Sequence, residues 1–259
     1  MDGYLSSASW KQLTVDYGIR PGEPPANSVR TIALSQLQDE AACHEYISWF
    51  RDYIGAPDTL VAASMLAKRI GYLWIVPLLT AMTFHNREVL CQMDKSFLYH
   101  PDLSAGQGGT RFPFLALEGL RTTAAPPDNR AVWREKVVRE VFAARLGPLL
   151  QTLSAAGPVS MAILWENIMV RIAPLYAAGK EDSGQDKQQM SEDFTYLTGT
   201  APGHLFNMRR NPFTRFTENN GLVQVARSKR STCCFYYRMS GEYCVKCPKI
   251  DNENESQLK

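Results

Sequence analysis

The sequence predicts an α+β protein that is mostly α-helical, with a helical body over residues 1–193 and a small β-containing C-terminal unit over residues 194–259. Apolar side chains recur at helical spacing in several long segments of the first part. The segment "KEDSGQDKQQMSED", residues 180–193, is polar and has no apolar periodicity, which is typical of a loop or linker. Beyond it, residues 221–239 are rich in β-branched and aromatic side chains with partial alternation, which indicates strands.

The first expected helix lies between residues 35 and 54. Ser35 and Gln38 have the spacing of a capping box, and Gly55 supplies a stop signal. Between them, apolar residues recur on one face of a helix: Ala42, Tyr46, Trp49, Phe50 and Tyr53.

A second helix is expected to begin after Asp58 and to run to about Phe84, with a bend at Pro77. Its longest apolar stretch, Ile70 to Phe84, is shorter than the about 20 residues that a helix needs to span a bilayer. We therefore expect a buried helix and no transmembrane segment.

Strands are expected at residues 89–91 and 112–117, around the loop "HPDLSAGQGGT". A third helix is expected from Asn129 to the pair Gly147-Pro148. A fourth should have Pro158 as its first residue and end at Gly179. Residues 251–259 form a polar tail.

The start of the chain, "MDGYLSSASWKQ", has no basic segment followed by an apolar run, so no secretory signal is expected. We expect a cytoplasmic protein, in which thiols stay reduced and clustered cysteines favour metal or redox chemistry over disulfides.

The C-terminal region is basic although the formal net charge of the whole chain is only +2. From Leu205 to Ile250 nine basic residues face two acidic ones. This imbalance predicts something anionic near this region.

Four of the six cysteines lie within fifteen positions: Cys233, Cys234, Cys244 and Cys247. Such clustering is unusual for small buried hydrophobic residues. A structural zinc site commonly uses two separated C-x-x-C pairs, and only Cys244 and Cys247 fit that pattern. Adjacent cysteines are easier to accommodate around a larger iron–sulfur cluster. Charge does not separate these alternatives, because both kinds of site have the same formal charge.

The segment "RSTCCFYYRMSGEYCVKCP", residues 230–248, combines adjacent cysteines, a "YR" pair and C-x-x-C-P. It resembles the C-terminal motif of bacterial ferric siderophore reductases, the ferric hydroxamate reductase family. "LWEN" (residues 164–167) and "NPFTRF" (residues 211–216) resemble the family less specifically. Nine residues separate the cysteine pairs, one fewer than the family's usual ten, which implies a one-residue deletion in this loop.

The resemblance implies one [2Fe–2S] cluster held by Cys233, Cys234, Cys244 and Cys247. It implies a reductase that passes one electron to a ferric siderophore, of the hydroxamate type by preference, and releases Fe(II) for iron assimilation. The helical body would dock the substrate, and a separate donor such as a ferredoxin or a flavoprotein reductase would supply electrons. No nucleic-acid partner is expected, and peripheral membrane association stays open.

The alternative is a non-enzymatic protein with a structural zinc site of four cysteines. Its basic surface would then bind a partner or nucleic acid.

Four residues beside the cysteines are candidates for tuning the cluster or docking its partners. Arg230 and Arg238 would influence the potential or attract an acidic siderophore or donor, and a solvated basic face is the alternative. Tyr236 and Tyr237 would shield the cluster or line the docking surface, and packing of a small β unit is the alternative.

Other polar residues have structural interpretations. Glu166 and Asn167 lie on an otherwise apolar helix and are expected to brace neighbouring helices rather than to catalyse. "GQGGT" (residues 106–110) lacks the ending of a phosphate-binding loop and is expected to be a flexible loop, so no nucleotide or flavin site is expected. The remaining candidates are scattered without ligand spacing: Cys43, His44, His85, Cys91, His100 and His204.

Overall fold

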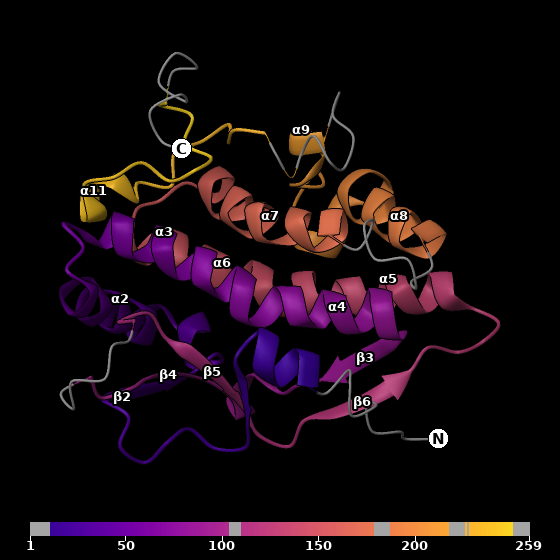
Figure 1. The fold of residues 1–259 in the computed structure, drawn as a ribbon, viewed down its shortest axis with the longest axis horizontal. Helices are drawn as coiled ribbons and strands as arrows, with labels where there is room; N and C mark the ends of the chain where they lie inside the picture. Colours follow the sequence, from indigo (N-terminus) through magenta and orange to yellow (C-terminus); the bar gives the residue numbers. More distant parts are fainter. Residues whose placement is uncertain (1–10, 104–109, 179–186, 218–225, 227, 251–259) are drawn as a thin grey trace.

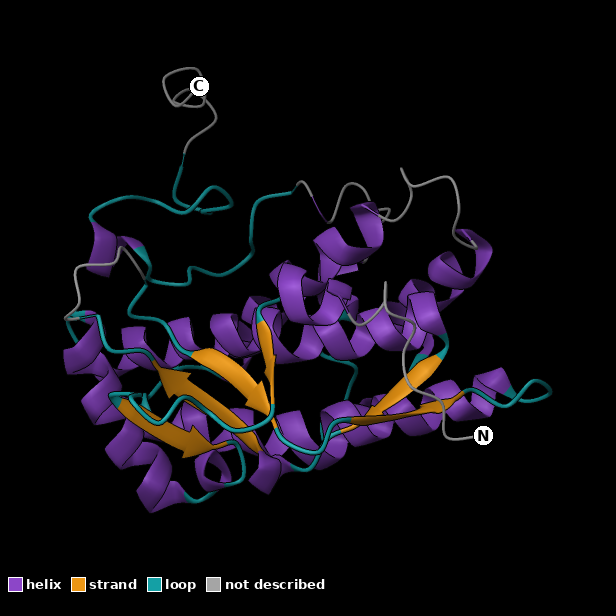
Figure 2. Cartoon of the chain, turned by 60° about the horizontal axis from the view of Figure 1, so that its bottom comes forward, coloured by secondary structure: helices purple, strands orange, loops and turns teal. Residues whose placement is uncertain are grey.

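The structure, a computed structural model, describes residues 11–103, 110–178, 187–217, 226 and 228–250. Helices form most of this part of the chain, and two small sheets lie along one side of them (Figure 1, Figure 2). The prediction of a mostly helical α+β protein is therefore confirmed. The tail at 251–259, the glycines at 106–109 and the expected stop at Gly179 lie outside the described residues.

All strands of the described residues lie in the first half of the chain. A four-stranded sheet has the order β1-β5-β4-β2, with β1 parallel to β5 and the other neighbours antiparallel. A separate antiparallel ribbon pairs β3 with β6. The strands are β1 (Ile19–Pro21), β2 (Arg30–Ala33), β3 (Arg87–Leu90), β4 (Ser96–His100), β5 (Phe114–Leu117) and β6 (Arg121–Ala124).

The prediction of strands next to the cysteines is wrong for the part that the structure describes. Residues 226 and 228–250 contain turns and a short helix, α11 (Tyr237–Ser240), and no strand. Residues 218–225 and 227 lie outside the described part. The local preference of β-branched and aromatic residues for strands is weak, and here contacts with the helical body set the conformation.

The first predicted helix begins later than expected. Helix α2 (Glu40–Ile54) starts after Asp39, whose carboxylate accepts a hydrogen bond from the Ala42 N–H at 2.9 Å. Ser35 instead precedes a 3₁₀ turn, η2 (Gln36–Gln38), and Gln38 is the last residue of this turn. Gly55 ends α2 as predicted, with a φ of 71° that glycine adopts readily.

The second predicted helix is continuous through its proline. It consists of α3 (Thr59–Ile70), the π-helical turn η3 (Gly71–Ile75) and α4 (Val76–His85). The Val76 N–H bonds to the carbonyl oxygen of Gly71, five residues back, immediately before Pro77. Because a π turn displaces the carbonyl that a proline ring would otherwise meet, Pro77 can follow without a break.

The same arrangement lets the third predicted helix continue past its expected end, so that prediction is wrong. Helix α5 (Arg130–Val141) passes through the π turn η5 (Phe142–Leu146) into α6 (Gly147–Ala156), so Gly147 and Pro148 lie inside a helical segment. Again the N–H before the proline bonds five residues back, from Gly147 to Phe142. Helix α7 (Met161–Ala178) begins three residues after the predicted Pro158, following a turn.

Part of the predicted linker is helical. Helix α8 (Lys187–Thr195) covers its last seven residues, so the loop prediction is wrong there, and the expected division after Asp193 falls inside this helix. Its sequence is polar, but Met190, Asp193 and Phe194 are buried. The chain continues through η6 (Tyr196–Thr200), η7 (Gly203–Phe206) and α9 (Thr214–Thr217).

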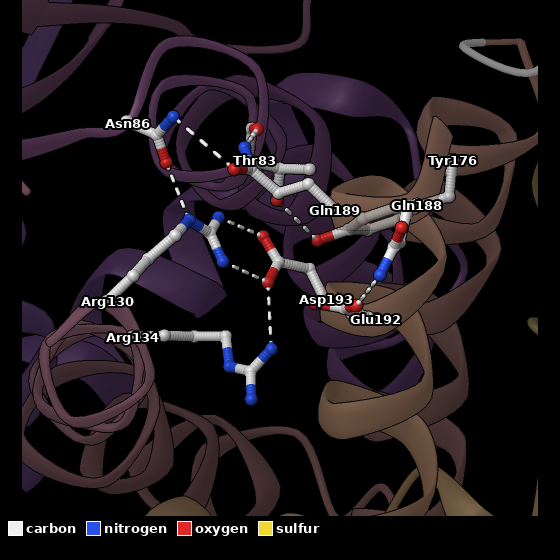
Figure 3. Close-up of polar contacts among 9 residues, drawn as sticks. All are labelled: Thr83, Asn86, Arg130, Arg134, Tyr176, Gln188, Gln189, Glu192 and Asp193. Carbon is white, nitrogen blue, oxygen red and sulfur yellow. Dashed lines mark hydrogen bonds and ion pairs between the residues drawn. The ribbon is translucent and has the colours of Figure 1, made fainter. Parts of the chain in front are cut away.

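A buried ion pair explains how a polar segment forms this helix (Figure 3). Asp193 is fully buried and accepts hydrogen bonds from both terminal nitrogens of Arg130, at 2.8 and 2.6 Å, and from Arg134 at 3.0 Å. Asn86, at the end of α4, accepts from Arg130 Nε at 2.6 Å. Tertiary contacts with α4 and α5 therefore stabilise α8.

The continuous segment Thr59–His85 is long and apolar enough to cross a membrane by length and composition alone. Within the described fold, 72% of its apolar window is buried. Core helices of soluble proteins meet the same criterion.

Candidate metal centre

The cysteine segment, residues 228–250, lies along the N-terminal halves of α3 and α7, at the upper left of Figure 1. Arg238 pairs with Asp58, the N-cap residue of α3, at 2.6 Å. The Ser64 hydroxyl of α3 donates a hydrogen bond to the Cys234 carbonyl oxygen at 2.9 Å. The cysteine segment, near the C-terminus, thus contacts helices that lie far away in the sequence.

Two of the four predicted ligands lie at the spacing of metal-bound thiolates. The sulfurs of Cys234 and Cys244 are 3.7 Å apart, and two thiolates bound tetrahedrally to one metal at about 2.3 Å would be about 3.8 Å apart. Cys234 and Cys247 are buried, whereas Cys233 and Cys244 are half-buried. Among the described residues no group of three or more His, Cys, Asp or Glu side chains is arranged to hold a metal ion. The structure therefore brings one pair to this spacing and not the complete set.

Turns, rather than a strand, present the adjacent cysteines. Phe235 has a φ of 62°, in the left-handed region that few residues other than glycine adopt. This turn directs the Phe235 N–H to the Cys233 sulfur at 3.3 Å. At the second pair, the Cys247 N–H bonds to the Cys244 carbonyl oxygen at 2.8 Å. The left-handed residue thus turns the chain immediately after the adjacent cysteines.

The pKa of Cys234 lies well below that of an ordinary thiol. The hydrogen bond with Cys244, against the opposing effect of burial and together with the charges of Lys68 and Arg230, lowers the pKa of Cys234 to about 5. The same hydrogen bond and burial raise the pKa of Cys244. Burial also raises the pKa of Cys233. A thiolate, not a thiol, is the form that binds metals.

Three cations interact electrostatically with this pair of sulfurs: Lys68 of α3, Arg171 of α7 and Arg230. Desolvation lowers the pKa of Lys68, and the Cys234 thiolate raises it. The sequence analysis named only Arg230. Lys68 and Arg171 were missed because they lie on distant helices, although each interrupts an otherwise apolar helix.

Glu166 of α7 binds the residues that precede the cysteines. Its buried carboxylate accepts hydrogen bonds from the backbone N–H groups of Ser231 at 2.6 Å and Thr232 at 2.7 Å, and from the Thr232 hydroxyl. The Arg230 guanidinium lies 3.8 Å away. Glu166 therefore anchors the two residues that precede Cys233.

Asn167 anchors the cysteines through α3. Its amide nitrogen donates to the backbone oxygen of Ser64 at 2.8 Å and to the Ser64 hydroxyl oxygen at 2.9 Å, and that hydroxyl in turn bonds to the Cys234 carbonyl. The expected role of Asn167 in bracing helices is confirmed. Glu166 instead braces a helix against the cysteine segment.

The other two motif segments form a shared aromatic core. Trp165 lies in edge contact with Phe206 and Phe213, at ring-centre distances of 6.0 and 5.5 Å. Phe142 of η5 lies 5.7 Å from the Phe213 ring. The Asn211 amide donates to the carbonyl oxygens of Leu197, in η6, and of Ala201, which follows η6, each at 3.0 Å. These contacts join the helical body to the chain leading to the cysteines.

The four predicted tuning or docking residues occupy different environments. Arg230 is buried, so the alternative of a solvated face is wrong for it. Arg238 makes the half-exposed ion pair with Asp58 described above. Tyr236 packs against the core, with the Lys68 ammonium 5.7 Å from its ring. Tyr237 accepts a hydrogen bond from Lys249 at 2.9 Å.

The scattered histidines and cysteines do not join this centre. Cys43 and Cys91 are buried in the hydrophobic core. His100 is buried among aromatic rings, bonded to the Tyr46 hydroxyl at 2.8 Å, and burial lowers its pKa to about 4. His44 and His204 are exposed, and His85 is half-buried.

The chain was also compared with known proteins. No protein-family model matches it, and no curated protein matches it.

Proposed function

We propose that the chain is a [2Fe–2S] reductase that passes one electron to a ferric siderophore and so releases Fe(II). The observation that carries the proposal is the pair of sulfurs 3.7 Å apart, in a set of four cysteines held beside three cations. Cys233, Cys234, Cys244 and Cys247 would hold the cluster.

The chemistry of the surroundings fits a negatively charged thiolate centre. Lys68, Arg171 and Arg230 would offset its charge and favour its reduced form, because nearby net charge helps to set a cluster potential. The Phe235 N–H, which donates to the Cys233 sulfur, would act in the same direction. When bound, a [2Fe–2S] cluster supplies single electrons, which suits the conversion of tightly chelated Fe(III) to weakly chelated Fe(II).

The exposed side of the cysteine segment would meet the substrate and a separate electron donor. Val245, inside the C-x-x-C pair, is 97% exposed, and Tyr243 is 51% exposed. A ligand set with two half-buried cysteines and such a rim would place the centre near the surface. A ferredoxin or a flavoprotein reductase fits the role of donor, and the site of action would be the cytoplasm.

Metal content and colour test the proposal first. Protein purified without oxygen should contain iron and sulfide in equal amounts, with visible absorption that dithionite bleaches. The reduced protein should then be reoxidised by ferric hydroxamate siderophores with release of Fe(II). The gallium(III) complex of the same siderophore is the matched control, because it has a similar shape and accepts no electron.

A structural zinc site is the second candidate, because 3.7 Å also fits two thiolates on one zinc ion. A colourless protein with one zinc per chain would support it and exclude the reductase. A cluster that bleaches but is not reoxidised by any ferric siderophore would limit the function to electron transfer or redox sensing.

A further inference from the structure

A cavity of ≈ 100 Å³ lies between α7 and the residues that lead into the cysteines. Four cations line it, namely Arg215, Lys229, Arg230 and Lys246, together with one carboxylate, Glu166. None of the four cysteines lines it. The cavity is therefore a site separate from the sulfurs, although Arg230 borders both.

Arg230 is the most informative group of this cavity. Its side chain is 1% exposed, yet Nε, Nη1 and Nη2 have no hydrogen-bond partner among the described residues. The Glu166 carboxylate is 3.8 Å away, and both its oxygens already accept hydrogen bonds from Ser231 and Thr232. Leaving a buried guanidinium unpaired costs considerable free energy, and native proteins rarely do so.

The other cations add positive charge without supplying an acceptor. The Lys229 ammonium donates to the Ile250 carbonyl oxygen at 2.6 Å, and the Lys246 ammonium donates to the Ala226 carbonyl oxygen. An ammonium group has three donors, so this one bond does not saturate Lys246. Arg215 is exposed, and its guanidinium carbon lies 5.0 Å from the Phe216 ring.

We propose that this cavity binds a small oxyanion: a free tetrahedral anion such as phosphate, or the carboxylate end of an organic acid. Its volume is several times the about 30 Å³ that one water molecule occupies. A guanidinium presents parallel N–H groups that match two oxygens of a carboxylate or phosphate. The anion would accept the unused donors of Arg230 and balance the positive charge of the cavity.

Calorimetric titration of the full chain with potassium phosphate, sodium sulfate and sodium acetate, at constant ionic strength set with chloride, tests the proposal. At least one of these anions should bind saturably, with one site per chain. Phosphate or sulfate binding alone identifies a tetrahedral anion, and acetate binding alone identifies a carboxylate. The readout is anion binding and does not depend on metal content, so it fails or succeeds independently of the reductase proposal.

Two variants locate the site. Arg215→Gln, at the exposed edge of the cavity, should weaken binding about tenfold, because it removes one charge-assisted contact. Arg210→Gln is the matched control, an exposed arginine outside the cavity, and should leave the affinity unchanged. The proposal is overturned by the absence of saturable binding, by unchanged affinity in Arg215→Gln, or by an equal loss in Arg210→Gln.

Discussion

Asp193 and Glu166 are both buried carboxylates beside arginines, but they are satisfied in different ways. Asp193 accepts three hydrogen bonds from Arg130 and Arg134, so carboxylate and guanidinium groups pair directly. Glu166 accepts instead from the backbone N–H groups of residues 231 and 232, and the guanidinium of its neighbour Arg230 has no hydrogen-bond partner within the described part of the chain.

This difference indicates that Asp193 stabilises the fold, whereas Glu166 positions residues of the candidate site. Around Asp193 both carboxylate oxygens accept hydrogen bonds from guanidinium groups, and the network fixes α8 against α4 and α5 (Figure 3). Glu166 positions the cysteine segment, and the cations that line a cavity together with it, Arg215, Lys229, Arg230 and Lys246, outnumber it. A buried guanidinium whose donors are unused among the described residues, as in Arg230, calls for a functional explanation.

The largest expected effect is the loss of the metal centre. Cys234→Ser removes one sulfur of the 3.7 Å pair and should reduce bound iron and sulfide to background. Cys91→Ser is the matched control, since Cys91 is a buried core thiol outside the cysteine segment, and it should keep its iron. Elemental analysis with visible absorption measures both. Equal iron in the two variants would show that the cysteine segment is not the centre.

On the other side of the comparison, Asp193→Ala should destabilise the fold without a specific effect on the cysteines. Removing one partner of a buried ion pair leaves Arg130 and Arg134 uncompensated, and such changes cost about 3–5 kcal/mol. Glu192→Ala, at the exposed neighbouring position, should change the free energy of unfolding by less than about 0.5 kcal/mol. Urea unfolding measures both variants, and similar values would refute the structural role of Asp193.

His100 offers a third case, a buried polar group that is satisfied by staying neutral. Its folded pKa of about 4 lies below the ordinary 6.5, because burial disfavours the charged ring and Arg30 adds repulsion. Between these two pH values the proton binds the unfolded state and not the folded state. The contribution of His100 to the free energy of unfolding is therefore fully present above pH 6.5 and falls by about 3 kcal/mol toward pH 4. The surrounding partners are the Tyr46 hydroxyl and the Arg111 carbonyl oxygen.

Urea unfolding between pH 4 and 7 measures this dependence. His100→Gln removes the titrating ring and should flatten the profile in this window. His44→Gln, at an exposed position, should leave the profile as in the wild type. A wild-type slope that persists in His100→Gln would assign the dependence to other groups.

The predicted helices were found because they are long and strongly periodic, whereas their ends depended on other features. Pro148 was expected to end a helix, but a preceding π turn let the chain continue. Helix α8 was missed because its stability comes from Asp193 and its arginine partners, which are distant in sequence. Four short strands were missed because pairing with other strands, rather than local composition, determines them.

The candidate site was predictable only in part, for the same reason. The cysteine motif predicted a candidate metal centre, and the structure places two of its four sulfurs 3.7 Å apart. The surrounding cations Lys68 and Arg171 come from α3 and α7, more than sixty residues away along the chain. Spacing within a segment reveals ligands, but the charge around them depends on tertiary packing.

The smallest expected effect tests how Glu166 differs from Asp193. Glu166→Gln keeps the shape of the side chain but removes its charge and one acceptor for the N–H groups of Ser231 and Thr232. The free energy of unfolding should fall by about 1.5–3 kcal/mol, the usual value for hydrogen bonds to a charged group. In metal-free protein it should also speed modification of Cys234 by a thiol reagent, as located by mass spectrometry. Glu242→Gln, an exposed control in the same segment, should change neither quantity. If Glu166→Gln lowered stability but left the modification rate of Cys234 unchanged, Glu166 would be a fold-holding group like Asp193, and the contrast between the two carboxylates would disappear.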